Sequence, residues 1–168
     1  MAIINVLSVV FDEASLSDAN NPSTVAITFS ETPVGFTADD VVTVGGAIGA
    51  LSAAVTNPDG TVTYTATFTA TDGFDGQASV TVGTGYTDAA GNTGLGDADT
   101  ATVDTVAPTF GPFSISSDLG ASSTDFITRD NTLSVSGSVG GAIGSTVSIE
   151  VTNSSGLVVT TLNGVVRS

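Results

Sequence analysis

Nearly all side chains of this sequence that could do chemistry are carboxylates. Seventeen acidic residues face only Arg129 and Arg167, without any His or Cys, so the formal net charge is −15. Ser/His and Cys/His nucleophiles and thiolate metal sites are therefore excluded, and no zinc site is expected. Carboxylate pairs that hydrolyse glycosides need aromatic platforms, which two Tyr and no Trp hardly supply. We predict that the protein is not an enzyme.

The charge also restricts the partners. Nucleic acids and anionic membrane surfaces bind through Lys and Arg, so neither is an expected partner. Cations are the natural partners, although such acidity also serves solubility or life in salty surroundings. No segment approaches the roughly twenty apolar residues of a membrane span, so no insertion into a membrane is expected. Residues 2–11 are apolar but lack a basic start, and they fit a strand better than a signal peptide.

Short β-strands must position these carboxylates. In Thr24–Ser30 and Thr61–Thr69, apolar residues alternate with Thr or Ser, which is the period of a half-buried strand. Asn57-Pro58-Asp59-Gly60 has the composition of a hairpin turn. We expect seven strands in the first part of the chain, at residues 3–11, 24–30, 41–44, 50–56, 61–69, 78–82 (extending towards 86) and 98–103.

Seven short strands in about a hundred residues are typical of an immunoglobulin-like sandwich, with a β-barrel or jelly roll as the alternatives. We therefore predict an all-β protein whose first domain spans residues 1–106. Pro108 in the stretch Val103–Thr109 favours extended backbone, so a short, semi-rigid joint should follow that domain.

Residues 107–168 begin a second immunoglobulin-like domain. Only four strands are expected there, at residues 113–116, 132–139, 145–152 and 157–162. Their edges cannot all be paired with one another, so this domain is incomplete within the chain. Either the sequence was cut inside a repeat, or a neighbouring molecule supplies the missing strands.

Loops of a sandwich alternate between its two ends, and this rule sorts the acidic residues. We expect six acidic residues at one end: Asp12, Glu13, Asp18, Asp72, Asp75 and Asp104. We expect seven residues at the opposite end: Glu31, Asp39, Asp40, Asp88, Asn92, Asp97 and Asp99. The first long loop of the second domain carries Asp118, Asp125 and Asp130. Like charges at about 5 Å repel by a few kcal/mol at an effective dielectric constant near 20, so a bound cation is the simplest compensation.

Calcium is the expected ion. It accepts Asp, Asn and backbone carbonyl ligands from flexible loops, whereas magnesium requires stricter octahedral geometry. For the loops at residues 72–76 and 88–92, an ordinary Asx turn without an ion remains the alternative. The metal ligands are thus predicted only as the set of residues named above.

Several stretches in order resemble a known family, the tandem bacterial immunoglobulin-like repeats of large secreted adhesins, including RTX-type adhesins, and of biofilm-associated surface proteins. The stretches are residues 25–31 with 35–41, the hairpin 57–68, the loop 86–92 and the joint 103–109, and in the second domain residues 117–131 are similar to the opening of another repeat subtype.

The resemblance implies a calcium-stiffened extender on the bacterial cell surface, outside the cell, whose partners are neighbouring repeats of the same protein and which projects a distal binding domain. Two alternatives come from other functional classes. One is a calcium-dependent carbohydrate-binding module at the end that holds Glu31 and Asp88. The other is a self-assembling filament subunit, in which a strand from another copy completes the second domain.

Overall fold

The computed structural model describes residues 3–116, 118, 122–129, 132, 134–140 and 146–165. Its strands confirm the all-β prediction, and the only helix among the described residues is a single 3₁₀ turn, η1 (Ala38–Asp40). The chain divides into two compact units, unit 1 (residues 1–106) and unit 2 (residues 107–168). No helix among the described residues is long and apolar enough to cross a membrane.

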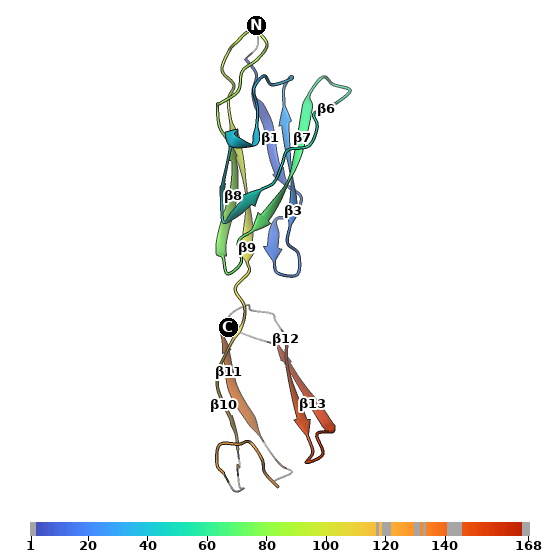
Figure 1. Cartoon of the computed structure of the whole chain (residues 1–168), viewed down its shortest axis with the longest axis vertical. Helices are drawn as coiled ribbons and strands as arrows, with labels where there is room; N and C mark the ends of the chain where they lie inside the picture. Colours follow the sequence, from blue (N-terminus) through green and yellow to red (C-terminus); the bar gives the residue numbers. More distant parts are fainter. Residues whose placement is uncertain are drawn as a thin grey trace. The chain divides into compact units, whose positions relative to one another are not determined.

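Unit 1 is a sandwich of two sheets (Figure 1). The first sheet has the order β1-β3-β7-β5, with β6 also pairing with β7; its strands are β1 (Val6–Phe11), β3 (Ser23–Phe29), β5 (Gly46–Ile48), β6 (Val55–Thr56) and β7 (Val62–Ala70). The second sheet has the order β2-β9-β8-β4, with β2 (Ser15–Ser17), β4 (Val41–Val44), β8 (Asp75–Val82) and β9 (Asp97–Asp104). All pairs are antiparallel except β2 with β9, which is parallel.

Alternating apolar residues fill the space between these sheets. Val25, Ile27 and Phe29 of β3 are fully buried, and Val80 of β8 and Val103 of β9 are buried from the other sheet. Burying each such side chain stabilises the fold by about 1.5–3 kcal/mol relative to leaving it exposed. The aliphatic core is completed by edge-to-face aromatic contacts that involve Phe29, Phe36, Tyr64 and Tyr86.

The prediction of a strand at residues 50–56 is wrong for most of that range. The chain instead forms β5 directly after β4, and Gly45 between them has a φ of 73°. A Cβ at Gly45 would approach the ring of Phe74 to 2.7 Å, so both the backbone and the packing require glycine. This corner moves the chain from the second sheet to the first, and only β6 forms within the expected range.

Other elements also differ from the expectation. The long first loop contains β2, which alternation could not reveal in three residues of the sequence Ser-Leu-Ser. Strand β8 begins at Asp75, earlier than expected, and ends at Val82 without reaching Tyr86. The predicted hairpin at residues 57–60 is confirmed, since Val55 pairs with Thr63 and Gly60 has a φ of 89°.

Unit 2 contains two separate antiparallel pairs. Strands β10 (Thr109–Ile115) and β11 (Val135–Gly140) form one two-stranded sheet, and β12 (Thr146–Thr152) and β13 (Val158–Val165) form the other. The four expected strands are therefore present, with β10 starting earlier than predicted. The described residues of unit 2 contain no fully buried hydrophobic side chain, in contrast to unit 1.

Candidate functional site

The end of unit 1 at which β9 finishes, here called the exit end, holds two carboxylates on adjacent strands. Asp75 of β8 lies directly opposite Asp104 of β9, and Ser17 of β2 lies opposite Asp104 on its other side. Directly opposed side chains share one face of a sheet, with Cβ atoms about 4.5–5.5 Å apart, and like charges in this position are destabilising. Unit 1 contains neither of the two arginines, so no basic side chain of its own offsets this pair.

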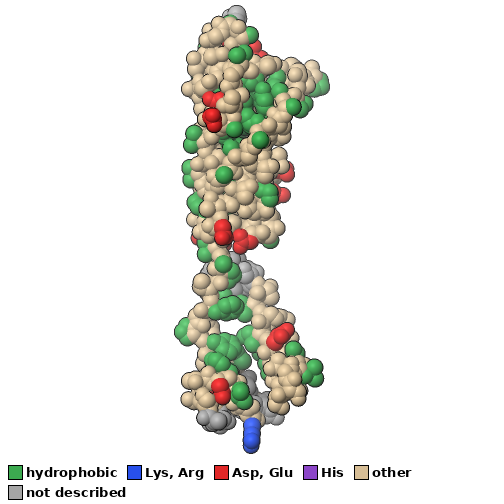
Figure 2. Space-filling view, in the orientation of Figure 1, with side chains coloured by type: hydrophobic (Ala, Val, Ile, Leu, Met, Phe, Trp, Pro, Cys, Tyr) green, Lys and Arg blue, Asp and Glu red, His purple; other side chains and the backbone are tan. Residues whose placement is uncertain are grey.

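The other exit-end carboxylates lie on the loops around this pair. Asp18 follows β2, and Asp72 belongs to the turn between β7 and β8. The amide of Asp12 donates to the Thr24 carbonyl at 2.8 Å, and the amide of Glu13 donates to Ser23 Oγ at 3.2 Å, which fixes the first loop beside β3. The structure thus brings Asp18, Asp72, Asp75 and Asp104 to the end of the sandwich that the strand order indicated, and Figure 2 shows acidic side chains at this end. Asp12 and Glu13 lie further from that end, because Phe11 is hydrogen-bonded to Asp99 and Ala14 to Thr102 within β9.

Carboxylates alone do not complete a metal site there. Among the residues that the structure describes, no group of three or more acidic side chains is arranged to hold one ion. Calcium often takes backbone carbonyls and waters besides carboxylates, so a site built on Asp75 and Asp104 would need such ligands. The donor set fits calcium in its chemistry, and the binding itself remains a prediction.

A buried threonine anchors the chain as it leaves the exit end, and sequence reasoning missed it. Thr105 is 1% exposed, its Oγ1 donates to the Thr71 carbonyl at 2.6 Å, and the same Oγ1 accepts the amide of Phe74 at 2.9 Å. Backbone bonds join the Thr105 amide to the Phe74 carbonyl at 2.8 Å and the Gly73 amide to the Thr105 carbonyl at 3.0 Å. The joint therefore begins with a residue that is fixed to the β7–β8 turn.

At the opposite end, where β1 begins, Asp88 forms an Asx turn of its own. Its Oδ1 accepts the amides of Ala90 and Asn92 at 2.8 and 2.9 Å, and its Oδ2 accepts the Asn92 side-chain amide at 2.7 Å. The hydrogen bond from the Asn92 side chain is the largest cause that holds the pKa of Asp88 below its ordinary value. Both oxygens of this carboxylate are already used, which favours the ion-free alternative for this loop.

Of the other carboxylates assigned to this end, here called the entry end, Asp40 has a structural partner. Asp40 Oδ2 accepts the Thr37 amide at 2.8 Å and caps η1. Glu31, Asp39 and Asp97 also lie at this end, and their side chains accept no hydrogen bond within the described residues.

The structure corrects the placement of Asp99. This residue lies within β9, away from the end loops, and its Oδ2 accepts the amide of Phe11 at 2.9 Å. The bond forms where the chain leaves β1 in the first sheet and crosses to β2 in the second. Sorting loops by strand order failed for Asp99 because the residue is not in a loop.

In unit 2 the predicted site is only partly described. Asp118 Oδ2 accepts the amide of Phe126 at 3.2 Å, and Asp125 Oδ1 accepts the amide of Ile127 at 3.1 Å. Asp118 Oδ1 is buried without a hydrogen-bond partner in the structure. Asp130, the third predicted residue, lies outside the described residues.

Two facing sheets, with a chain that crosses from the first sheet to the second between β1 and β2, define unit 1 as an immunoglobulin-like sandwich. A family model of the bacterial Ig-like domain matches residues 5–110. Because this match covers more than half of the chain, the chain belongs to the bacterial Ig-like domain family, whose members are generally structural and not enzymatic. A search of curated proteins gave no match. The attribution to RTX-type or biofilm-associated adhesins remains a prediction.

Proposed function

We propose that the chain is a non-catalytic extender of a bacterial surface adhesin or filament, whose repeats outside the cell project a distal binding domain. The observation that carries this proposal is that the chain enters and leaves unit 1 at opposite ends. Asn5 forms a bridge with Leu95 at the entry end, and β9 runs from there to Asp104 at the exit end (Figure 1). At about 3.3 Å per strand residue, the unit advances the chain by roughly 30 Å.

The strand arrangement also suits a unit that is pulled from its two ends. Force applied at the entry end acts along β1, which pairs with β3, and force at the exit end acts along β9, which pairs with β2 and β8. Both terminal strands are then loaded parallel to their own axes, so several hydrogen bonds must break together. Thr105 passes the load to the β7–β8 turn.

Calcium is proposed to stiffen the exit end. The support is chemical: two opposed carboxylates, Asp75 and Asp104, have further acidic loops around them and no basic residue within unit 1. A cation there would remove the repulsion of this pair and hold the strand that leaves the domain. The entry end is a weaker candidate because Asp88 already accepts hydrogen bonds through both of its oxygens and Asp40 caps η1. At the exit end, Asp104 accepts only the amide of Val106, through Oδ1 at 3.1 Å, and Asp75 accepts no hydrogen bond within the described residues.

Thermal unfolding of the whole chain with calcium and with a chelator tests the metal. An ion that binds only the folded state stabilises it by about 2.7 kcal/mol at a hundred times its dissociation constant, so the unfolding midpoint of unit 1 should rise in calcium. Magnesium at the same concentration is the control and should produce a smaller rise. Equal midpoints in calcium and chelator would remove the ion from the proposal while leaving the extender geometry intact.

A further inference from the structure

The chain crosses the sandwich of unit 1 between β1 and β2, so that its first strands belong to both sheets. β1 pairs with β3 in the first sheet, whereas β2 pairs in parallel with residues 102–104 of β9 in the second. Just before β2, the Thr102 amide donates to the Ala14 carbonyl at 3.0 Å. The last strand of unit 1 is thus hydrogen-bonded directly to a segment that lies early in the chain.

Tension between the two ends of unit 1 loads this parallel pair in shear. Because β2 is parallel to β9, both strands run from the entry end toward the exit end. Tension at the entry end pulls β2, through β1, back toward that end, while tension at the exit end pulls β9 in the opposite direction. The two strands are therefore pulled along their own axes, and the hydrogen bonds between them are loaded together.

The order of the strands makes this pair unavoidable when the two ends separate. In the chain β2 lies between β1 and β3, which both belong to the first sheet, whereas β9 belongs to the second. If β1 shears away from β3, the pairing of β2 with β9 still connects the two ends. If the sheets slide past each other instead, β2 must move with the first sheet and leave β9. Both routes require β2 and β9 to part.

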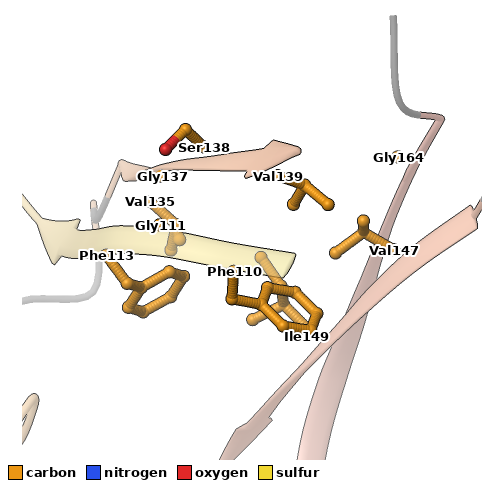
Figure 3. A pocket seen from close by; sticks show the side chains of 10 residues that line it. All are labelled: Phe110, Gly111, Phe113, Val135, Gly137, Ser138, Val139, Val147, Ile149 and Gly164. Carbon is orange, nitrogen blue, oxygen red and sulfur yellow. The ribbon is translucent and has the colours of Figure 1, made fainter. Parts of the chain in front are cut away.

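Unit 2 differs in this respect within its described residues. Its two strand pairs, β10 with β11 and β12 with β13, form separate sheets that no described strand pairing connects. Figure 3 shows apolar side chains from both pairs, such as Phe110 and Ile149, facing a groove between them. The contact between β2 and β9 is thus a feature of unit 1, where a strand from one end of the domain is paired directly with the strand that leaves at the other.

Two side chains hold β2 and the crossing segment in place. Leu16, at the centre of β2, is 1% exposed and lies in the core. Asp99, within β9, accepts the Phe11 amide through Oδ2 at 2.9 Å, at the point where the chain leaves β1. A hydrogen bond to an ionised acceptor is stronger than one between neutral groups. Asp99 therefore fixes the start of the crossing to the same strand that β2 pairs with.

We propose that the pairing of β2 with residues 102–104 of β9, here called the latch, sets the force at which unit 1 opens, with Asp99 as its positioning residue. The latch rests on the proposed extender function, since it matters only in a domain that is loaded through its ends. It assigns the resistance to three residue pairs of the second sheet and not to the longer pairing of β1 with β3. Forced unfolding follows the unfolding rate, so the latch is measured as a rate under load.

The first test locks β1 to β3 and leaves the latch free. Val10 and Ala26 lie opposite each other in that pairing, and Val10 is 48% exposed. Opposed Cα atoms of antiparallel strands are about 5.5 Å apart or less, which a disulfide spans, so Val10→Cys with Ala26→Cys gives a cross-link in a chain without other Cys. The whole chain is held through its termini at constant force in chelator, in the oxidised and the reduced form.

Unit 1 should unfold equally fast in the two forms, because the latch is the same in both. The unfolding step should be roughly 50 Å shorter in the oxidised form, because the disulfide closes residues 10–26 in a loop, and this difference verifies the cross-link. Slower unfolding of the oxidised form would place the resistance in the pairing of β1 with β3 and would overturn the proposal.

The second test changes the positioning residue under the same load. Asp99→Ala removes the acceptor of the Phe11 amide, and unit 1 should then unfold about tenfold faster or more, as expected for the loss of a hydrogen bond to a charged group. Asp99→Asn keeps an oxygen that can accept the amide, so it should restore most of the resistance. Asn92→Ala is the control for stability alone, since it removes a hydrogen bond at the entry end and should leave the rate under load near that of wild type.

The direction of pulling separates the latch from an ordinary contribution to the fold. Attachment through Pro58→Cys and Ala90→Cys, two turn positions at the entry end, does not load the latch, so Asp99→Ala should have little effect on the rate there. An equal acceleration in both directions, or none in either, would overturn the role of Asp99. Wild type that unfolds equally fast in both directions would instead refute the extender function itself. If Asp99→Ala does not fold, the comparison of the oxidised and reduced forms still decides between the latch and the β1–β3 pairing.

Discussion

At the scale of single residues, the carboxylates of unit 1 divide into two groups. Asp40, Asp88 and Asp99 accept backbone amides and are part of the fold. Asp75 accepts no hydrogen bond within the described residues and lies opposite Asp104. The first group should matter for stability without any ion, and the second group should matter in a way that depends on calcium.

The effect of Asp75→Asn on the stability of unit 1 is expected to have opposite signs in chelator and in calcium. In chelator it should stabilise unit 1 by about 0.2–1 kcal/mol, because it removes a like charge directly opposite Asp104. In calcium it should reduce the stabilisation that the ion gives, because it removes a charged ligand. Urea unfolding in the two conditions measures both effects. The control is Asp39→Asn, the same change of charge at the entry end, and an equal response of both variants to calcium would argue against an exit-end site.

Asn92→Ala tests the role of Asp88. The hydrogen bonds of the folded state lower the pKa of Asp88, so they contribute stability above its ordinary pKa, and this contribution is lost as the pH falls through the lowered value. Without the Asn92 amide the pKa should move up toward its ordinary value, and the variant should be less stable than wild type at neutral pH. The difference should disappear in strong acid. Carboxyl titration by NMR and unfolding at several pH values measure this, and a difference independent of pH would contradict the assignment.

At the scale of elements, Thr105 connects the last strand to the joint. Thr105→Val keeps the shape of the side chain but removes the hydroxyl that bonds to Thr71 and Phe74, so it should cost about 1–3 kcal/mol. Thr67→Val, on the exposed face of β7, should change the stability by less than about 0.5 kcal/mol. Chemical unfolding of both variants makes the comparison. Equal costs would mean that the hydroxyl of Thr105 is not an anchor.

Most elements could be predicted from the sequence because their signals are local. Alternation over seven or nine residues revealed β3 and β7, and the turn residues Asn57–Gly60 revealed the β6–β7 hairpin. The crossing strand β2 and the corner at Gly45 depend on contacts with β9 and with Phe74, which are distant in sequence, so composition could not show them.

The candidate site was predictable only in part, for the same reason. Strand order was sufficient to bring Asp18, Asp72, Asp75 and Asp104 to the exit end, since that order follows from the sandwich, but it misplaced Asp12 and Glu13. It could not show that Asp75 and Asp104 are direct neighbours, because that depends on the register of β8 and β9. The hydrogen bonds of Asp88 could be foreseen as an Asx turn, whereas the bond from Phe11 to Asp99 joins residues 88 positions apart.

At the scale of the whole molecule, the central claim is that unit 1 carries load between its two ends. Single-molecule pulling of the chain tests it most directly, and specific attachment is simple because the sequence has no Cys of its own. One form is attached through its two termini. The control form carries Pro58→Cys and Ala90→Cys, two exposed turn positions at the entry end, so that pulling separates the strands one hydrogen bond at a time.

The account predicts that unit 1 unfolds at a clearly higher force when it is pulled through the termini than through residues 58 and 90. It further predicts that a chelator lowers the force for the terminal attachment and has little effect on the control. Equal unfolding forces for the two attachments would contradict the proposal that this domain is built as an extender.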